Sequence, residues 1–184
     1  MKGILVIVGR SGSGKSTIAK ELSLYYKQPL LTFSKMGREL ARKKGLSNLK
    51  EYYVSANEKE FRDELCQHLM EEISMGLQKS NFVIIDDLIY DKVVLMIRKK
   101  FLNVLIFNIE VPYEIRVKRI ADRLSVTIKE AQKVEKEKAD LKEAIGIENV
   151  LKNCEYILDG RKSIQELIEE FIGLVEKRNW KISS

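Results

Sequence analysis

The sequence predicts an α/β domain in which a parallel sheet is covered by helices on both faces. Two observations indicate this class. Apolar runs of strand length, such as residues 82–85 and 104–107, are continuous rather than alternating, which is typical of strands buried on both sides. These runs alternate along the chain with longer helical stretches. At 184 residues with 45% hydrophobic residues, the chain is expected to form one domain with an ample core.

Each element follows from its local pattern. The first strand is the apolar run at 4–8, Pro29 opens the second strand, and Pro112 opens a helix, where a missing amide hydrogen costs little. Strands are expected at about 3–8, 29–33, 82–86, 103–109 and 154–158. Helices are expected at about 14–27, 35–44, 57–79, 91–100, 112–124, 127–143 and 163–178.

The loop after the first strand reads G-x-x-x-x-G-K-S and opens a helix, which is the context that a phosphate-binding loop requires. Glycines let successive backbone N–H groups face phosphate oxygens, and the helix adds its positive N-terminal end. Lys15 is expected to reach the β- and γ-phosphates, and the Ser16 hydroxyl to bind Mg²⁺. The alternative is an ordinary Gly/Ser-rich turn. The flanking strand and helix favour binding of ATP and Mg²⁺ by Gly9, Arg10, Ser11, Gly12, Ser13, Gly14, Lys15, Ser16 and Thr17.

Two acidic residues end the third apolar run. Asp86 follows residues 83–85 directly, which is the placement of a Walker B acid that holds Mg²⁺ with Ser16 or orients the acceptor. For Asp87 the pattern does not decide whether it has a similar role. The alternative for both residues is that they are turn acids that cap the next element.

Three arginines share one helix face. Arg116, Arg119 and Arg123 stand at i, i+3 and i+7, and apolar neighbours would dock the helix on the sheet. Arg119 and Arg123 are predicted to neutralise the transferring phosphoryl group, as an arginine finger in cis does, and Arg116 is open between this role and an ordinary surface position. Arg38 follows the second strand and could grip the acceptor, joined by Arg62.

Residues 129–143 hold five lysines and five acids with a thin apolar stripe. Such a segment is either a solvated surface helix or a lid over ATP. Its position directly after the arginine helix favours a lid at about 119–145. Within a single domain of residues 1–184, a helical insertion at about 35–79 is then expected to bind the acceptor.

Composition limits the partners. The net charge of +6 fits anionic ligands but is too diffuse to demand nucleic acid. Cys66 and Cys154 form no metal-ligand pattern, and the only histidine, His68, sits in an amphipathic stretch where packing or exposure is the expected role. No segment approaches membrane-spanning length and no signal sequence is recognisable, so a cytoplasmic protein is expected, as a monomer or homodimer.

The order of these features resembles the nucleoside monophosphate kinase branch of the P-loop kinases over about residues 1–172. The phosphate loop, the segment Phe33–Ala41, the strand ending at Asp86 and the arginine helix carry the resemblance. It implies a three-layer P-loop kinase fold with a five-stranded parallel sheet and a helical lid. It also implies that Ser34 and Arg38 begin the acceptor site, with Arg38 on the monophosphate, as in adenylate and cytidylate kinases.

The segments at 140–143 and 154–160 look more like dephospho-CoA kinases, in which the last strand and its loop would lie near the adenine. The chain also departs from these patterns. Met36-Gly37 replaces the usual Gly-Asp, Asp87 replaces a glycine, and the acidic pair that dephospho-CoA kinases carry after the second strand is absent. Lysines stand where many relatives have distal lid arginines, at Lys133, Lys136 and Lys138.

The function expected from the sequence is ATP-dependent phosphoryl transfer to a small nucleotide, with a nucleoside monophosphate as the acceptor. Two alternatives stay open: phosphorylation of dephospho-CoA, and a nucleotide-binding regulator with weak ATPase activity.

Overall fold

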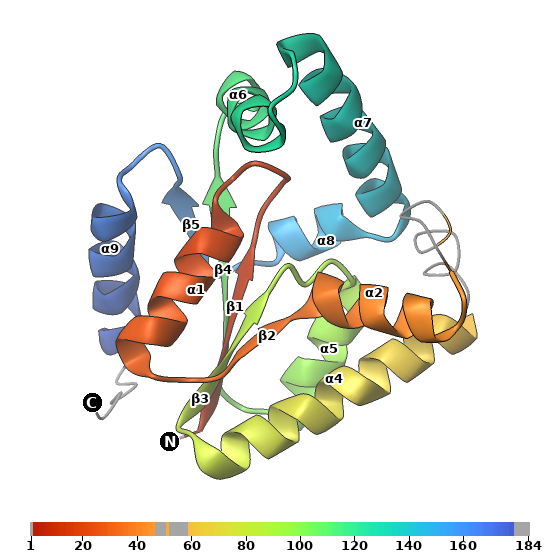
Figure 1. Ribbon diagram of the computed structural model, residues 1–184. Coiled ribbons are helices and arrows are strands. Elements are labelled where there is room, and N and C mark those ends of the chain that lie inside the picture. Colours follow the sequence, from red (N-terminus) through yellow and green to blue (C-terminus); the bar gives the residue numbers. More distant parts are fainter. Residues whose placement is uncertain (1, 47–50, 52–58, 179–184) are drawn as a thin grey trace.

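The computed structural model describes residues 2–46, 51 and 59–178. In this part of the chain, five parallel strands form one sheet in the order β2-β3-β1-β4-β5 (Figure 1). The register places Val6 of β1 between Ile85 of β3 and Ile106 of β4. The strands are β1 (Gly3–Val8), β2 (Leu30–Thr32), β3 (Phe82–Asp86), β4 (Val104–Glu110) and β5 (Tyr156–Asp159).

Helices cover both faces of the sheet because successive side chains of each strand point to opposite faces. Leu5 and Ile7 of β1 pack with α1 (Lys15–Tyr26) and α9 (Ile164–Glu176), whereas Ile4 and Val6 pack on the opposite side. That side is covered by α2 (Phe33–Lys43), α4 (Lys59–Lys79), α5 (Asp91–Lys100) and α8 (Ile147–Lys152). The predicted three-layer α/β class is confirmed.

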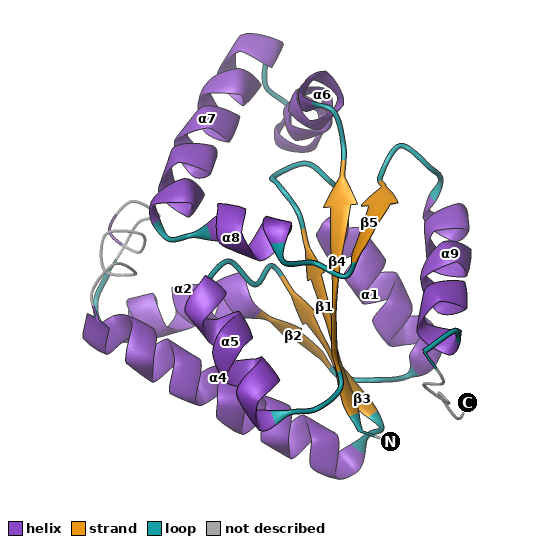
Figure 2. Cartoon of the chain, turned by 180° about the vertical axis from the view of Figure 1, so that it is seen from behind, coloured by secondary structure: helices purple, strands orange, loops and turns teal. Residues whose placement is uncertain are grey.

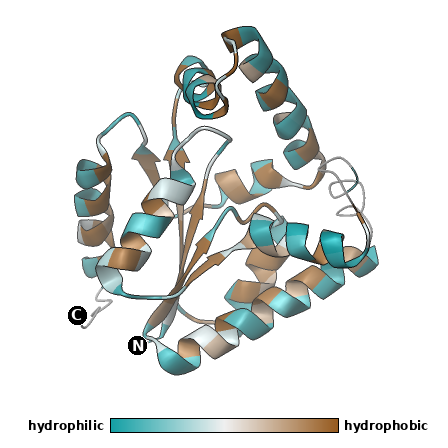
Figure 3. Cartoon of the chain, in the orientation of Figure 1, coloured by the Kyte–Doolittle hydropathy of each residue, from teal (hydrophilic) through white to brown (hydrophobic). Residues whose placement is uncertain are grey.

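Two further helices, α6 (Tyr113–Leu124) and α7 (Ile128–Ala144), lie beyond the carboxyl-terminal ends of the strands (Figures 1 and 2). They pack on each other through a small apolar cluster that includes Val117, Ile120 and Ala131. Elsewhere α7 is largely hydrophilic, in contrast to the apolar strands (Figure 3). A capping box formed by Thr127 and Glu130 fixes the start of α7. The carboxyl-terminal edge of the sheet is therefore covered by polar helical surface.

Several element ends differ from the predicted ranges by one or two residues, and two differences change how a segment is assigned. Helix α8 was not predicted, because its six residues are too few to show a helical period. The predicted second strand included Phe33, but β2 ends at Thr32, which pairs with Asp86, and Phe33 turns inward as the first residue of α2. None of the helices in the described ranges is long and apolar enough to cross a membrane.

Candidate active site

The loop between β1 and α1 has the geometry of a phosphate-binding loop. Gly12 has a φ of 81°, and a Cβ there would lie 2.6 Å from the carbonyl oxygen of Arg116, so only glycine fits. Gly14, with a φ of 90°, is the N-cap of α1, and no side chain caps this helix. The first amides of α1 are thus left for an external acceptor, and they add the positive end of the helix dipole.

Two lysines share one carboxylate oxygen beside this loop. Lys15 Nζ lies 3.4 Å from Asp87 Oδ1, and Lys142 Nζ, from α7, lies 2.8 Å from the same atom. All three residues are buried. Burial alone would raise the pKa of Asp87, but Lys15 and Lys142 outweigh it and lower that pKa to about 2. Burial also lowers the pKa of Lys15, against the opposing influence of Asp87. Asp87 is therefore a firmly ionised counterion.

Asp86 ends β3 on the other side of Lys15. Its side chain is buried, its Oδ1 has no hydrogen-bond partner, and the Ser16 hydroxyl is near enough to influence its pKa. Burial raises its pKa, while Lys15 and the Ser16 hydroxyl partly offset this effect. Mg²⁺ takes oxygen ligands, keeps several waters and needs only one or two protein groups. A buried carboxylate with a free oxygen beside a hydroxyl fits that ion, and no cluster of three or more ligating side chains occurs among the described residues.

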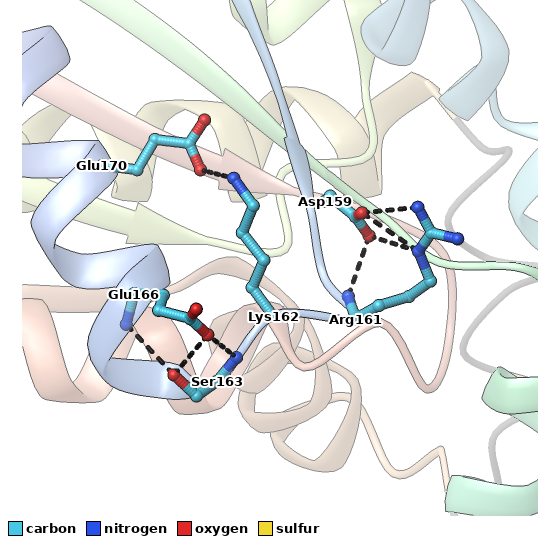
Figure 4. Close-up of polar contacts among 6 residues, drawn as sticks. All are labelled: Asp159, Arg161, Lys162, Ser163, Glu166 and Glu170. Atoms are coloured by element: carbon cyan, nitrogen blue, oxygen red, sulfur yellow. Dashed lines mark hydrogen bonds and ion pairs between the residues drawn. The ribbon is translucent and has the colours of Figure 1, made fainter.

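Arg119 spans the phosphate loop and the loop after β5. Its Nη2 donates to the carbonyl of Gly160 at 2.8 Å, and its Nη1 donates to the carbonyl of Ser13 at 3.4 Å. The loop after β5 is itself held by local contacts (Figure 4). Arg161 pairs with Asp159, Lys162 pairs with Glu170, and Ser163 forms a capping box with Glu166. Arg119 therefore lies beside Gly14 at the start of α1 and is held by backbone carbonyls of two loops.

Arg116 and Arg10 connect the phosphate loop to α7 and α8. The buried Arg116 guanidinium donates to the carbonyls of Val111 and Ser11, at 3.2 and 3.1 Å, and pairs with Glu135 of α7. Arg10 pairs with Glu143 at 3.3 Å and with Glu148 of α8. For Arg116, whose role the sequence left open, the structure gives a buried connecting position rather than a surface one.

Cations of α2, α6, α7 and the phosphate loop act electrostatically on one lysine, Lys138. Burial lowers the pKa of Lys138 on α7, and four neighbouring cations lower it further. These are, in order of influence, Arg123 on α6, Lys142 on α7, Lys15 in the loop and Arg38 on α2. We call these five residues the cation cluster. Because like charges this close repel one another, the arrangement favours the binding of a polyanion.

Comparison with known proteins places the chain in a family. The family model described as "AAA domain" matches residues 5–140. The chain belongs to this AAA domain family. No curated protein matches it significantly.

Solved structures give the fold of this AAA domain. Shikimate kinase from Aquifex aeolicus VF5 is 18% identical with a TM-score of 0.56, covering 96% of this chain and 98% of its own. A gluconokinase from Sinorhizobium meliloti 1021 is 13% identical with a TM-score of 0.62, covering 97% of both chains. TT1252 from Thermus thermophilus is 18% identical with a TM-score of 0.65, covering 96% of this chain and 97% of its own. The AAA domain thus has the P-loop kinase fold.

Two other residues predicted to bind the acceptor, Ser34 and Arg62, lie on α2 and α4. Ser34 is in the first turn of α2, one turn before Arg38. Arg62 lies on α4 one turn before Cys66, and its charge acts on that thiol, whose pKa burial raises to about 11. The predicted role of Arg62 in acceptor binding stays a prediction.

Lys142 and Glu135 were not predicted as site residues from the sequence. Both lie on α7 and both are buried, although α7 as a whole is charged and hydrophilic. A signal for Lys142 was present: it stands at i+4 from Lys138, which puts the two ammonium groups on one face of the helix.

Proposed function

We propose that this AAA domain protein is an ATP-dependent phosphotransferase that moves the γ-phosphoryl group of Mg-ATP to a nucleoside monophosphate. The observation that carries the proposal is the gathering of cations at the phosphate loop: Lys15 and Lys142 lie 3.4 and 2.8 Å from Asp87 Oδ1, and Arg119 donates to the carbonyl of Ser13. Phosphoryl transfer depends on positioning and on neutralising charge, and a donor triphosphate with an acceptor phosphate brings more negative charge than one lysine can balance. The solved kinases of similar fold support phosphotransfer as the reaction class.

The roles of individual residues follow from their positions. The loop backbone and Lys15 would bind the β- and γ-phosphates, and Arg119 and Arg123 would stabilise the charge of the transferring group. Asp86 and Ser16 would hold the Mg²⁺ ion, which would help to neutralise the charge of the phosphates. The helices over this edge would limit the access of water, which suppresses ATP hydrolysis.

The chemistry of the two carboxylates beside Lys15 favours a phosphate over a hydroxyl as the acceptor. A hydroxyl acceptor has to lose a proton to a base, whereas a monophosphate is already ionised at neutral pH. Asp87, with a pKa of about 2 and two lysines on one oxygen, is a weak base. Asp86 is assigned to the metal, and the turn after β2 carries no carboxylate in residues 32–34. Arg38 of α2 is then the acceptor's phosphate ligand.

The test is ADP production from Mg-ATP with a panel of acceptors: AMP, CMP, UMP, GMP, dTMP, their deoxy forms and dephospho-CoA. We expect a strong response to one monophosphate. Arg38→Met should then raise the KM for that acceptor by about tenfold or more, with the KM for ATP little changed, because one charge-assisted contact is lost. Arg42→Met, one turn later on α2 and exposed, is the matched control. Equal effects of the two variants would contradict the assignment of Arg38.

One observation favours a second candidate, a nucleotide-binding regulator with weak ATPase activity. Lys15 pairs with Asp87, and it would have to leave this carboxylate in order to pair with a phosphate of ATP. This competition would favour regulated binding of ATP over fast turnover. A regulator would bind ATP and hydrolyse it slowly whether or not an acceptor is present, whereas a kinase consumes ATP only with the right acceptor. The same panel separates the two, and a response to dephospho-CoA alone would indicate the third possibility.

A further inference from the structure

The Asp87 carboxylate marks a position at which two ammonium groups hold one anionic oxygen. Lys15 Nζ and Lys142 Nζ lie 3.4 and 2.8 Å from Asp87 Oδ1, and the side chains of all three residues are at most 11% exposed. Lys15 belongs to the phosphate loop, and the motif assigns its ammonium group to the β- and γ-phosphates. Lys142 comes from α7, more than a hundred residues along the chain, and no phosphate-binding motif includes it.

We propose that Lys142 is a ligand of the γ-phosphate of bound ATP, shared with Lys15. Two ammonium groups that reach one carboxylate oxygen are close enough together to reach oxygens of one phosphoryl group. An ammonium is a compact point charge on a flexible stem, so it can move from carboxylate to phosphate by rotating its side chain. The proposal rests on the proposed function in one respect, that the nucleotide bound is a triphosphate.

The end of α7 is anchored in a way that fixes the reach of Lys142. Glu135, about two turns earlier on the helix, is bound to Arg116, which also donates to the carbonyl of Ser11 in the phosphate loop. Glu143, the next residue after Lys142, pairs with Arg10 of the same loop at 3.3 Å. Contacts on both sides of Lys142 therefore tie α7 to the phosphate loop, and the ammonium group is held at the loop rather than in solvent.

Direct comparison of two nucleotides tests this role, because only a triphosphate offers a γ-phosphate. Titration calorimetry would measure the affinity of the protein for Mg-AMP-PNP and for Mg-ADP in wild type and in Lys142→Met. We expect Lys142→Met to weaken AMP-PNP by about tenfold or more and to change ADP by less than about twofold, since one charge-assisted contact is lost. Lys129→Met removes a lysine from an exposed position of the same helix and should change neither.

Two outcomes would overturn the proposal. Unchanged affinity for AMP-PNP would mean that Lys142 does not reach the γ-phosphate. An equal loss for AMP-PNP and ADP would mean that Lys142 only supports the loop as a partner of Asp87. Lys142→Arg keeps the charge and should retain most of the preference for AMP-PNP. If Lys142→Met does not fold, as judged by circular dichroism and thermal melting, Lys142→Gln keeps a hydrogen-bond donor toward Asp87 and replaces it in the same titrations.

These titrations contain no acceptor, so their result is independent of the acceptor assignment. A panel in which no monophosphate is phosphorylated, together with a selective loss of AMP-PNP binding in Lys142→Met, would reject the nucleoside monophosphate kinase function and retain the role of Lys142. The reverse result would retain the kinase and reject this role.

Discussion

Replacing Glu135 by alanine should destabilise the protein through one buried ion pair. The side chains of Arg116 and Glu135 are only 7% and 6% exposed. Removing the carboxylate leaves a buried guanidinium without its counterion, and breaking a buried pair in this way costs about 3–5 kcal/mol. Arg116 keeps its hydrogen bonds to the carbonyls of Val111 and Ser11, so we expect the lower end, about 3 kcal/mol.

Urea unfolding followed by circular dichroism would measure this loss. For a domain of this size, 1 kcal/mol corresponds to about 2–4 °C in Tm, so the melting temperature should fall by about 6–12 °C. Glu137→Ala removes the same side chain from an exposed position of α7 and should stay within about 0.5 kcal/mol of wild type. A loss below about 1 kcal/mol in Glu135→Ala would show that the pair is solvated and that it does not hold α7 against the phosphate loop.

Two further predictions concern the lysine–carboxylate group. The folded-state pKa of Asp87 is about 2 against an ordinary value of 3.8, so its contribution of about 2 kcal/mol is complete above pH 4 and is lost as the pH falls toward 2. Urea unfolding across this range should therefore show a steeper fall in stability for wild type than for Asp87→Asn, in which asparagine tolerates the φ of 64°, and parallel curves would contradict the assignment. Lys15→Met should lower the acceptor-dependent rate of ADP formation by at least about a hundredfold with the fold intact, and an unchanged rate would remove Lys15 from the site.

Local pattern was enough to predict the sheet and the phosphate loop. The bounds of β1, β3 and α5 agree with the predicted ranges, because continuous apolar runs and the Gly-x-x-x-x-Gly-Lys-Ser spacing are short-range signals. Helix α8 was missed because its place depends on packing: Ile147 and Val150 are buried in the core cluster that also holds α5, and six residues show no period of their own.

The three arginines of α6 show why spacing could not assign their roles. Their positions at i, i+3 and i+7 place them on one face, but what each one contacts depends on segments that pack there from elsewhere in the chain. Arg116 contacts Glu135 and the phosphate loop, Arg119 contacts the loop after β5, and the charge of Arg123 lowers the pKa of Lys138. The catalytic roles predicted for Arg119 and Arg123 stay predictions.

The same reasoning applies to α7, where composition indicated either a solvated helix or a lid. Three contacts bind this helix to the rest of the site: Glu135 with Arg116, Glu143 with Arg10, and Lys142 with Asp87. The first of them involves no group that we assign to phosphate, so it can persist when a nucleotide binds. The third would exchange carboxylate for phosphate. Closure of α7 over ATP would then require the Lys142 ammonium group to move, but not the helix. The entropy lost in ordering the site on ATP binding would therefore be small.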